Sequence, residues 1–221
     1  GVAAVVTVTA LAAGARSSIN DQISNLGSNA LIVFPRSARA SGVRSLLSGS
    51  RLSELDADAL VRESTSIKAA TPFLRASGTI IHEGQNAKAS IIGARLAYFD
   101  IRNWKVQRGE VWTTTSEALG EKVIVIGSET ARELFGSSDP VGRMVRIGRH
   151  PYRVLGVLEE KGPSPFGQSQ DEIVLMPMTT IRSHILVTQR GSTHAILMSA
   201  TSEETTERAK RQAEAILRDR H

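Results

Sequence analysis

The first fifteen residues, GVAAVVTVTALAAGA, carry no charge, and a polar, charge-rich sequence follows them directly. As a helix, at about 1.5 Å per residue, this stretch is roughly 22 Å long, whereas a bilayer core is about 30 Å thick. We therefore expect residues 1–28 to be the end of a transmembrane helix that continues into a stalk helix. An Ala- and Val-rich core helix of a soluble protein is the alternative reading of the same pattern.

Composition excludes several classes of function. The chain has no cysteine, which rules out disulfides, a thiol nucleophile and cysteine-ligated metal sites. The net charge of +5 comes from 27 basic and 22 acidic residues mixed along the chain, and aromatic residues make up only 4% of it. Because no run of Lys or Arg exceeds two residues and only nine aromatic residues could stack on bases, nucleic-acid binding is not expected.

The N-terminal part of the polar sequence predicts a strand, a helix and a second strand. The apolar run at 29–35 is closed by a proline, as is typical of a short strand. Ser53 and Asp56 have the spacing of a capping box, which predicts a helix that starts there. A second strand is expected at 67–73. This order gives a β-α-β unit.

The C-terminal end repeats this theme. Residues 194–199 predict a strand, and Thr201 with Glu204 predicts the cap of the helix that follows. Apolar residues recur at helical spacing up to Leu217, which indicates one buried face. Because neither end can bury its apolar face alone, we expect the two ends to pack together as a ferredoxin-like, porter-type βαβ layer.

Between the two ends the pattern changes to short strands and turns. A helix is predicted at 129–135, with Ser128 as N-cap and Gly136 at its end. Strands are predicted at 77–82, 87–92, 123–126, 144–147, 152–158 and 173–176. The expected fold class is therefore α+β: a layer formed by residues 29–75 and 187–221, with a mostly-β subdomain inserted at 76–186.

No known catalytic motif is found. The chain has no G-x-S-x-G, no phosphate-binding P-loop, no G-x-G-x-x-G and no histidine pair at a metal-ligand spacing. The sequence therefore predicts no catalytic residue, no metal ligand and no cofactor, and we expect the isolated chain to have no ATPase activity.

The loop KGPSPFGQSQD, residues 161–171, is the candidate partner contact. It combines two prolines and two glycines with a single aromatic residue, Phe166. An aromatic side chain on a semi-rigid loop suits a contact with a partner, and Gln168 and Asp171 flank it. The alternative is that Phe166 folds back and anchors its own loop. A second aromatic group, formed by Tyr98, Phe99, Trp104 and Trp112, is typical of a local core beneath a loop.

The order of the motifs resembles one family, the periplasmic core domain of MacB-type ABC transporter permeases in the FtsX/LolC-like superfamily. The resemblance covers nearly the whole chain and is carried by ISNLGSN at 23–29, VIG at 125–127, LFG at 134–136, DPVG at 139–142 and VLGV at 154–157.

This resemblance implies a porter-like layer with an inserted sabre-like subdomain, on the periplasmic side of a bacterial inner membrane. It implies a membrane-anchored homodimer whose ATPase, as a fused domain or separate subunit, drives periplasmic conformational change. It further implies export with an adaptor and an outer-membrane channel. The alternatives in the same superfamily are lipoprotein release and a non-transporting domain that regulates a cell-wall hydrolase.

Overall fold

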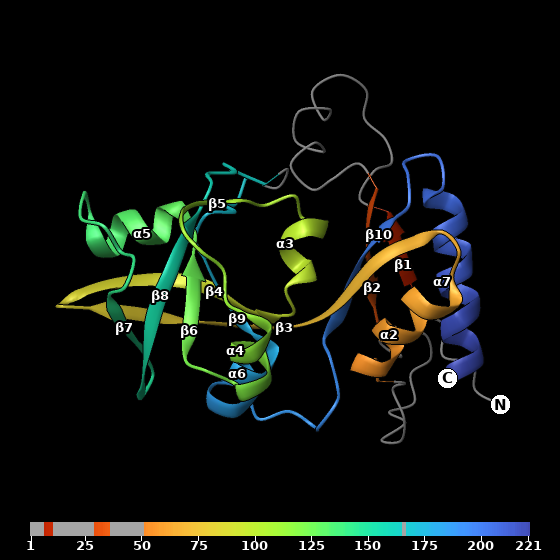
Figure 1. Ribbon diagram of the computed structural model, residues 1–221, viewed down its shortest axis with the longest axis horizontal. Helices are drawn as coiled ribbons and strands as arrows, with labels where there is room; N and C mark the ends of the chain where they lie inside the picture. Colours follow the sequence, from red (N-terminus) through yellow and green to blue (C-terminus); the bar gives the residue numbers. More distant parts are fainter. Residues whose placement is uncertain (1–6, 11–28, 36–50, 165–166) are drawn as a thin grey trace, which may run out of the picture. The chain divides into compact units, whose positions relative to one another are not determined.

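The computed structural model describes residues 7–10, 29–35, 51–164 and 167–221. The chain divides into two compact units (Figure 1). Unit 1 joins the residues up to Phe73 to Gln189–His221, and unit 2 is Leu74–Thr188. The sequence-based boundaries, 75/76 and 186/187, lie close to these. Mixed helices and sheet confirm the α+β class.

Unit 1 contains a split β-α-β motif. Strands β1 (Thr7–Ala10), β2 (Ala30–Phe34), β10 (Ala195–Ala200) and the first part of β3 (Ile67–His82) lie in the order β1-β2-β10-β3. Strand β10 is antiparallel to both β2 and β3, so these two run parallel to each other with β10 between them. Helix α2 (Glu54–Glu63) connects them, as the ferredoxin-like pattern requires.

Two helices among the described residues of unit 1, α2 and α7, close its core. Helix α7 (Thr206–Arg220) contacts α2 and strands β1, β2 and β10 (Figure 1). The register pairs Val33 with Ile196, and both side chains belong to one buried cluster. The helices add Ala57, Leu60, Ala209, Ala213 and Leu217 to this cluster.

The start of α2 is capped as its sequence predicts. The Asp56 backbone N–H donates to Ser53 Oγ at 3.3 Å, and the Ser53 N–H donates to Asp56 Oδ2 at 2.8 Å. The capping box is therefore complete. The cap expected for α7 is wrong, because this helix begins at Thr206 after Thr205, and Thr205 Oγ1 accepts from the Ser202 N–H at 3.0 Å.

At the N-terminus the structure differs from the expected helix. Residues Thr7–Ala10 form β1, which pairs antiparallel with β2. Their Thr-Val-Thr sequence is β-branched, and such residues fit a pleated strand better than a helix. The rest of the segment predicted at 1–28 lies outside the described residues. In the described part of the chain, no helix is both long and apolar enough to span a membrane.

Unit 2 is a closed ring of strands. Strand β3 adjoins β4, β4 pairs with β9, β9 with β6, β6 with β8, β8 with β7, and β7 returns to β3. A short strand, β5, adds to the second half of β8. The bounds are β4 Gln85–Ala94, β5 Val106–Gly109, β6 Val123–Ile126, β7 Met144–Ile147, β8 His150–Leu158 and β9 Ile173–Pro177. The strands predicted at 67–73 and 77–82 are one continuous strand, β3.

Unit 2 also contains four short helices, and the sequence predicted only the one at 128–135. They are α3 (Ala97–Ile101), α4 (Thr114–Leu119), α5 (Ser128–Phe135) and α6 (Met178–His184). In α5 the N-cap is Gly127 rather than the expected Ser128, whose side chain makes no cap hydrogen bond. The end at Gly136 is as predicted, with φ of 59°.

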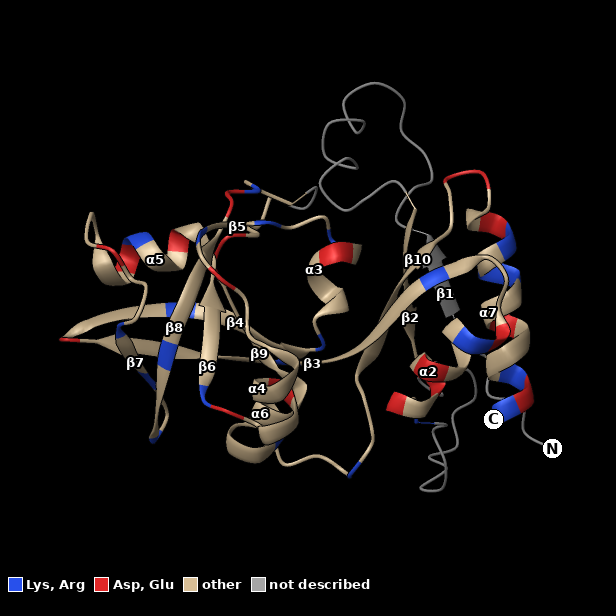
Figure 2. Ribbon diagram, viewed as in Figure 1, with Lys and Arg blue, Asp and Glu red and all other residues tan. Residues whose placement is uncertain are grey.

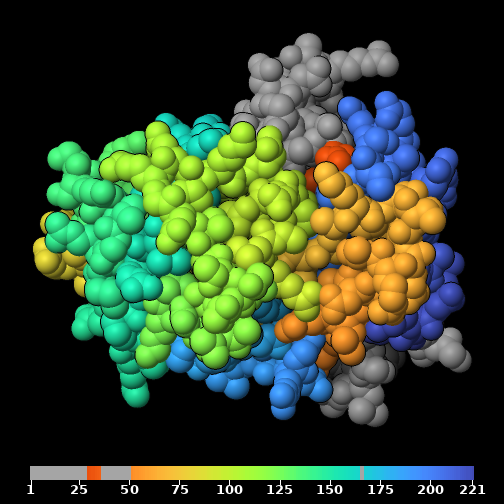
Figure 3. Space-filling view, viewed as in Figure 1, coloured from red at the N-terminus to blue at the C-terminus, as the bar shows by residue number. Residues whose placement is uncertain are grey.

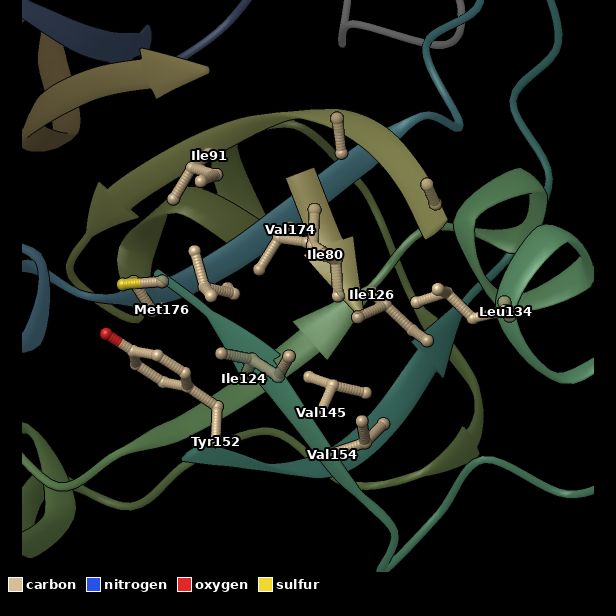
Figure 4. Close-up of a cluster of buried hydrophobic side chains, with 14 of the residues drawn as sticks. Ile80, Ile91, Ile124, Ile126, Leu134, Val145, Tyr152, Val154, Val174 and Met176 are labelled. Atoms are coloured by element: carbon tan, nitrogen blue, oxygen red, sulfur yellow. The ribbon is translucent and has the colours of Figure 1, made fainter. Parts of the chain in front are cut away.

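The interior of the ring is filled with apolar side chains (Figure 4). Figure 4 shows Ile80 of β3, Ile124 and Ile126 of β6, Val154 of β8 and Val174 of β9 pointing toward one another. Tyr152 enters the same cluster and is fully buried. Its hydroxyl has no hydrogen-bond partner among the described residues, and burial raises the pKa of Tyr152 to about 12.

Replacing Tyr152 with phenylalanine should raise the free energy of unfolding by about 1 kcal/mol. A buried hydroxyl without a partner loses its hydrogen bonds to water on folding, and the phenylalanine ring fills the same space. Urea unfolding measures the change. Tyr152→Ala is the matched comparison and should cost about 3–5 kcal/mol through the cavity it leaves. A Phe variant less stable than the parent would show that the hydroxyl has a partner.

Candidate functional site

The candidate loop joins the end of β8 to the start of β9 and is held by its own backbone. Pro163 and Ser169 form an isolated antiparallel bridge. Between them, the Ser164 N–H donates to the Gln168 carbonyl at 2.6 Å, and the Gly167 N–H donates to the Ser164 carbonyl at 2.9 Å. The two sides of the loop are thus joined by these hydrogen bonds. Phe166 lies outside the described residues, so its predicted contact stays a prediction.

Asp171 closes the base of the loop. Its side chain is only 3% exposed, and its two carboxylate oxygens accept the backbone N–H groups of Lys161 and Gly162, each at 2.8 Å. Its backbone carbonyl accepts the Thr130 N–H from α5 at 3.3 Å. Both carboxylate oxygens are used inside the loop. Asp171 is therefore an anchor of the loop, not the exposed partner contact expected from sequence.

Gln168 is exposed, as a contact residue must be, and it lines a groove. The groove has a volume of about 520 Å³ and is lined by residues of β3 and β4 and of the segment 168–172. Most side chains along it are small: Ser77, Gly78, Thr79, Ala89, Ser90 and Ser169. Lys88 and Glu172 supply one charge of each sign. The groove is therefore lined mainly by small side chains and carries one charge of each sign.

Lys161 fastens the base of the loop to the segment after α3. Its Nζ donates to the Arg102 carbonyl at 3.0 Å and lies 5.3 Å from the centroid of the Trp104 ring. Arg102 also donates to Gln170 Oε1 at 3.2 Å. Desolvation and the nearby Arg102 charge lower the pKa of Lys161 to about 8. Sequence reasoning missed Lys161 and Arg102, although the neighbouring aromatic residues are the signal that could have found them.

Lys161 should titrate near pH 8 in the folded chain and near its ordinary 10.5 in urea. Because folding favours the neutral amine, its contribution to stability is least favourable below pH 8 and improves as pH rises from 8 to 10.5. The ¹³Cε chemical shift of Lys161 measures the midpoint. Arg102→Gln should raise this midpoint, since it removes the like charge. The same midpoint in the folded chain and in urea would contradict the assignment.

The aromatic residues near the loop form the local core that the sequence predicts. Tyr98, Phe99, Trp104 and Trp112 are all buried. The Phe99 and Trp112 rings meet edge to face with centroids 5.2 Å apart. Trp104 Nε1 donates to the Glu159 carbonyl at 2.9 Å, which ties this core to the start of the loop.

The geometry suits binding and mechanical support. Within the described ranges, no group of three His, Asp or Glu side chains is placed to hold a metal ion. A charge cluster lies in unit 1, where the carboxylate of buried Asp56 accepts a hydrogen bond from Arg220 Nε at 2.8 Å and contacts His221 Nε2 at 2.9 Å. Burial alone would raise the pKa of Asp56, but the hydrogen bonds from Arg220, Ser53 and His221 outweigh it and lower the pKa.

The chain matches one family model over residues 1–216, that of the MacB-like periplasmic core domain. A relative from Rhodospirillum rubrum, "Macrolide export ATP-binding/permease protein MacB", is 35% identical over the whole chain, which covers 33% of that relative. One of the same name from Bdellovibrio bacteriovorus is 37% identical over 81% of the chain and 28% of the relative. The chain thus spans about a third of the length of these curated relatives.

Solved structures share the fold. The periplasmic region of MacB from Actinobacillus actinomycetemcomitans superimposes with a TM-score of 0.66 at 20% identity, over 88% of this chain and 86% of that one. The extracellular domain of the transporter YknZ from Gram-positive bacteria gives 0.65 at 22% identity, over 77% and 84%. At such identities the likeness concerns the fold alone.

Proposed function

We propose that this chain, which belongs to the MacB-like periplasmic core domain family, couples ATP hydrolysis on the cytoplasmic side to a conformational change in the periplasm. Its relatives carry both ATP-binding and permease in their names, so a permease domain of an ABC-type transporter is its family context. The proposed role is export with an adaptor and an outer-membrane channel, as part of a membrane-anchored homodimer. The ATPase is then a domain or subunit outside this chain.

The observation that carries the proposal is the Asp56 cluster between α2 and α7. The last turn of α7 contributes Arg220 and His221, and the first turn of α2 contributes Asp56, which also caps its own helix. The ion pair between partly exposed Arg220 and buried Asp56 links the end of α7 to the start of α2. Displacement of the end of α7 would therefore move α2 and the sheet beneath it as one body, which is what mechanical coupling needs.

The test is Arg220→Gln in the complete reading frame, expressed with its adaptor in a macrolide-sensitive strain. Losing the Arg220 hydrogen bond loosens the end of α7, while Ser53 and His221 still hold Asp56. We expect ATPase activity to persist and macrolide efflux to fall about fivefold or more, the scale of a coupling energy of 1–3 kcal/mol. Efflux of a labelled macrolide and phosphate release from the purified protein measure the two.

Arg218→Gln is the matched control, because Arg218 is exposed on the same helix turn and the same charge is removed. Equal efflux from both variants would contradict a coupling role for the Asp56 cluster. If the parent protein exports no macrolide, released lipoprotein and cell-wall hydrolase activity are measured in the same strain. A positive result in either of these assays would assign this chain to lipoprotein release or to hydrolase regulation instead of macrolide export.

A further inference from the structure

The β7–β8 hairpin carries a concentration of positive charge that the proposed function does not use. Between Asp139 and Glu159 the sequence contains four arginines and no acidic residue or lysine. The arginines are Arg143, Arg146, Arg149 and Arg153, which we call the hairpin arginines. They lie just before β7, within it, in the turn and within β8.

All four hairpin arginines are exposed. In the described part of the chain, none of their guanidinium groups has a carboxylate oxygen within 4.0 Å. Figure 2 shows their positive charge along β7, β8 and the turn that joins them, and the tip projects from the surface in Figure 3 (teal, lower left). The residues that the structure describes therefore form no ion pair that neutralises this charge.

A groove lies beside the hairpin, so the positively charged surface is also concave. It has a volume of about 610 Å³ and is lined by Arg143, Arg146 and Arg149 together with His82 of β3. Its apolar lining includes Met144, which is 50% exposed. The one acidic residue in the lining, Glu83, has its carboxylate 3.7 Å from His82 Nε2 and extends into solvent.

We propose that the hairpin arginines and Met144 form a docking surface for an acidic segment of a partner protein. Guanidinium groups bind carboxylates through two parallel hydrogen bonds, so arginine rather than lysine marks recognition of a carboxylate. Arginine and methionine are also the side chains enriched at protein interfaces, whereas lysine is depleted there. A membrane surface attracts lysine and arginine alike, and the hairpin has no lysine. The surface is independent of the export proposal, since it follows from the charge and exposure of the hairpin alone.

The test measures binding of a short fluorescein-labelled peptide of alternating Glu and Leu, by fluorescence anisotropy at low salt. Arg143→Gln, Arg146→Gln and Arg149→Gln are combined in one variant. Arg208→Gln, Arg211→Gln and Arg218→Gln, all exposed on α7, form a control that removes the same charge. We expect the hairpin variant to bind about tenfold more weakly or worse and the control to change less than about twofold. Met144→Gln should weaken the Glu-Leu peptide but not a Glu-Gln peptide.

Three results would overturn the proposal. Equal weakening in the hairpin variant and the control would mean that net charge alone attracts the peptide. Binding no stronger than that of a Gln-Leu peptide would mean that the surface does not recognise carboxylates. Vesicles of phosphatidylglycerol that bind through the hairpin arginines, when the acidic peptide does not, would assign the surface to an anionic lipid. Circular dichroism of both triple variants confirms that the exposed substitutions leave the fold intact.

Discussion

Gly127→Ala will lower the free energy of unfolding by about 3–5 kcal/mol. A Cβ atom at this position would lie 2.1 Å from the Asp171 carbonyl oxygen and 2.9 Å from Ile173 Cγ2. Backbone cannot yield as a flexible side chain does, so β9 must move away from the start of α5. That movement also breaks the bonds from the Gly127 N–H to the Ile173 carbonyl at 2.8 Å and from the Thr130 N–H to the Asp171 carbonyl.

Gly136→Ala at the other end of α5 is the matched control. A Cβ there meets nothing within 4 Å, so the substitution meets only the strain of a backbone at φ of 59°. With ψ of −119° this backbone lies outside the αL region, and the strain costs about 1–3 kcal/mol. Urea unfolding of the two variants separates the steric clash from the backbone strain. Similar losses in both would mean that β9 gives way easily at Gly127.

Asp171→Ala should be almost as damaging, at about 3–5 kcal/mol. The carboxylate is buried and accepts two backbone N–H groups, from Lys161 and Gly162. Hydrogen bonds to a charged group are worth about 1.5–3 kcal/mol each, and the substitution removes both of them. Loss of the anchor should also open the loop, which limited proteolysis at the loop detects.

Two further substitutions serve as comparisons for Asp171→Ala. Asp171→Asn keeps one acceptor oxygen and should lose roughly half as much stability, whereas exposed Glu172→Ala should change it by less than about 0.5 kcal/mol. Urea unfolding midpoints order the three variants. An Asp171→Ala variant as stable as Glu172→Ala would show that water replaces the carboxylate at the base of the loop.

Local sequence signals located most of the regular elements. The capping box of Ser53 and Asp56 specified where α2 begins, because both partners are three residues apart and need no distant contact. Short apolar runs such as 123–126 became strands with the predicted bounds. The recurrence of Ala209, Ala213 and Leu217 likewise identified the buried face of α7.

The elements that the sequence did not predict share a physical cause. Helices α3, α4 and α6 are five to seven residues long, too short to show a helical period, and packing rather than propensity forms them. Thr180 of α6, for example, donates to the Glu121 carbonyl at 2.6 Å just after α4. At Gly127 the cap is decided by how closely β9 approaches, which no local pattern records.

The candidate site, too, was predicted from the sequence only in part. Sequence alone indicated the loop at 161–171 and the aromatic core beside it, since proline, glycine and aromatic content are properties of a single segment. It assigned Asp171 to the exterior, because burial depends on the distant backbone groups that satisfy a carboxylate.

The family, the α+β class and the capped start of α2 follow from spacing along the chain. Three facts depend on the tertiary fold: β7 returns to β3 and closes a ring, Arg220 and His221 meet Asp56, and no carboxylate of the described residues lies within 4.0 Å of the hairpin arginines. These facts join residues far apart in sequence, and they are fixed by strand register and side-chain packing across the fold.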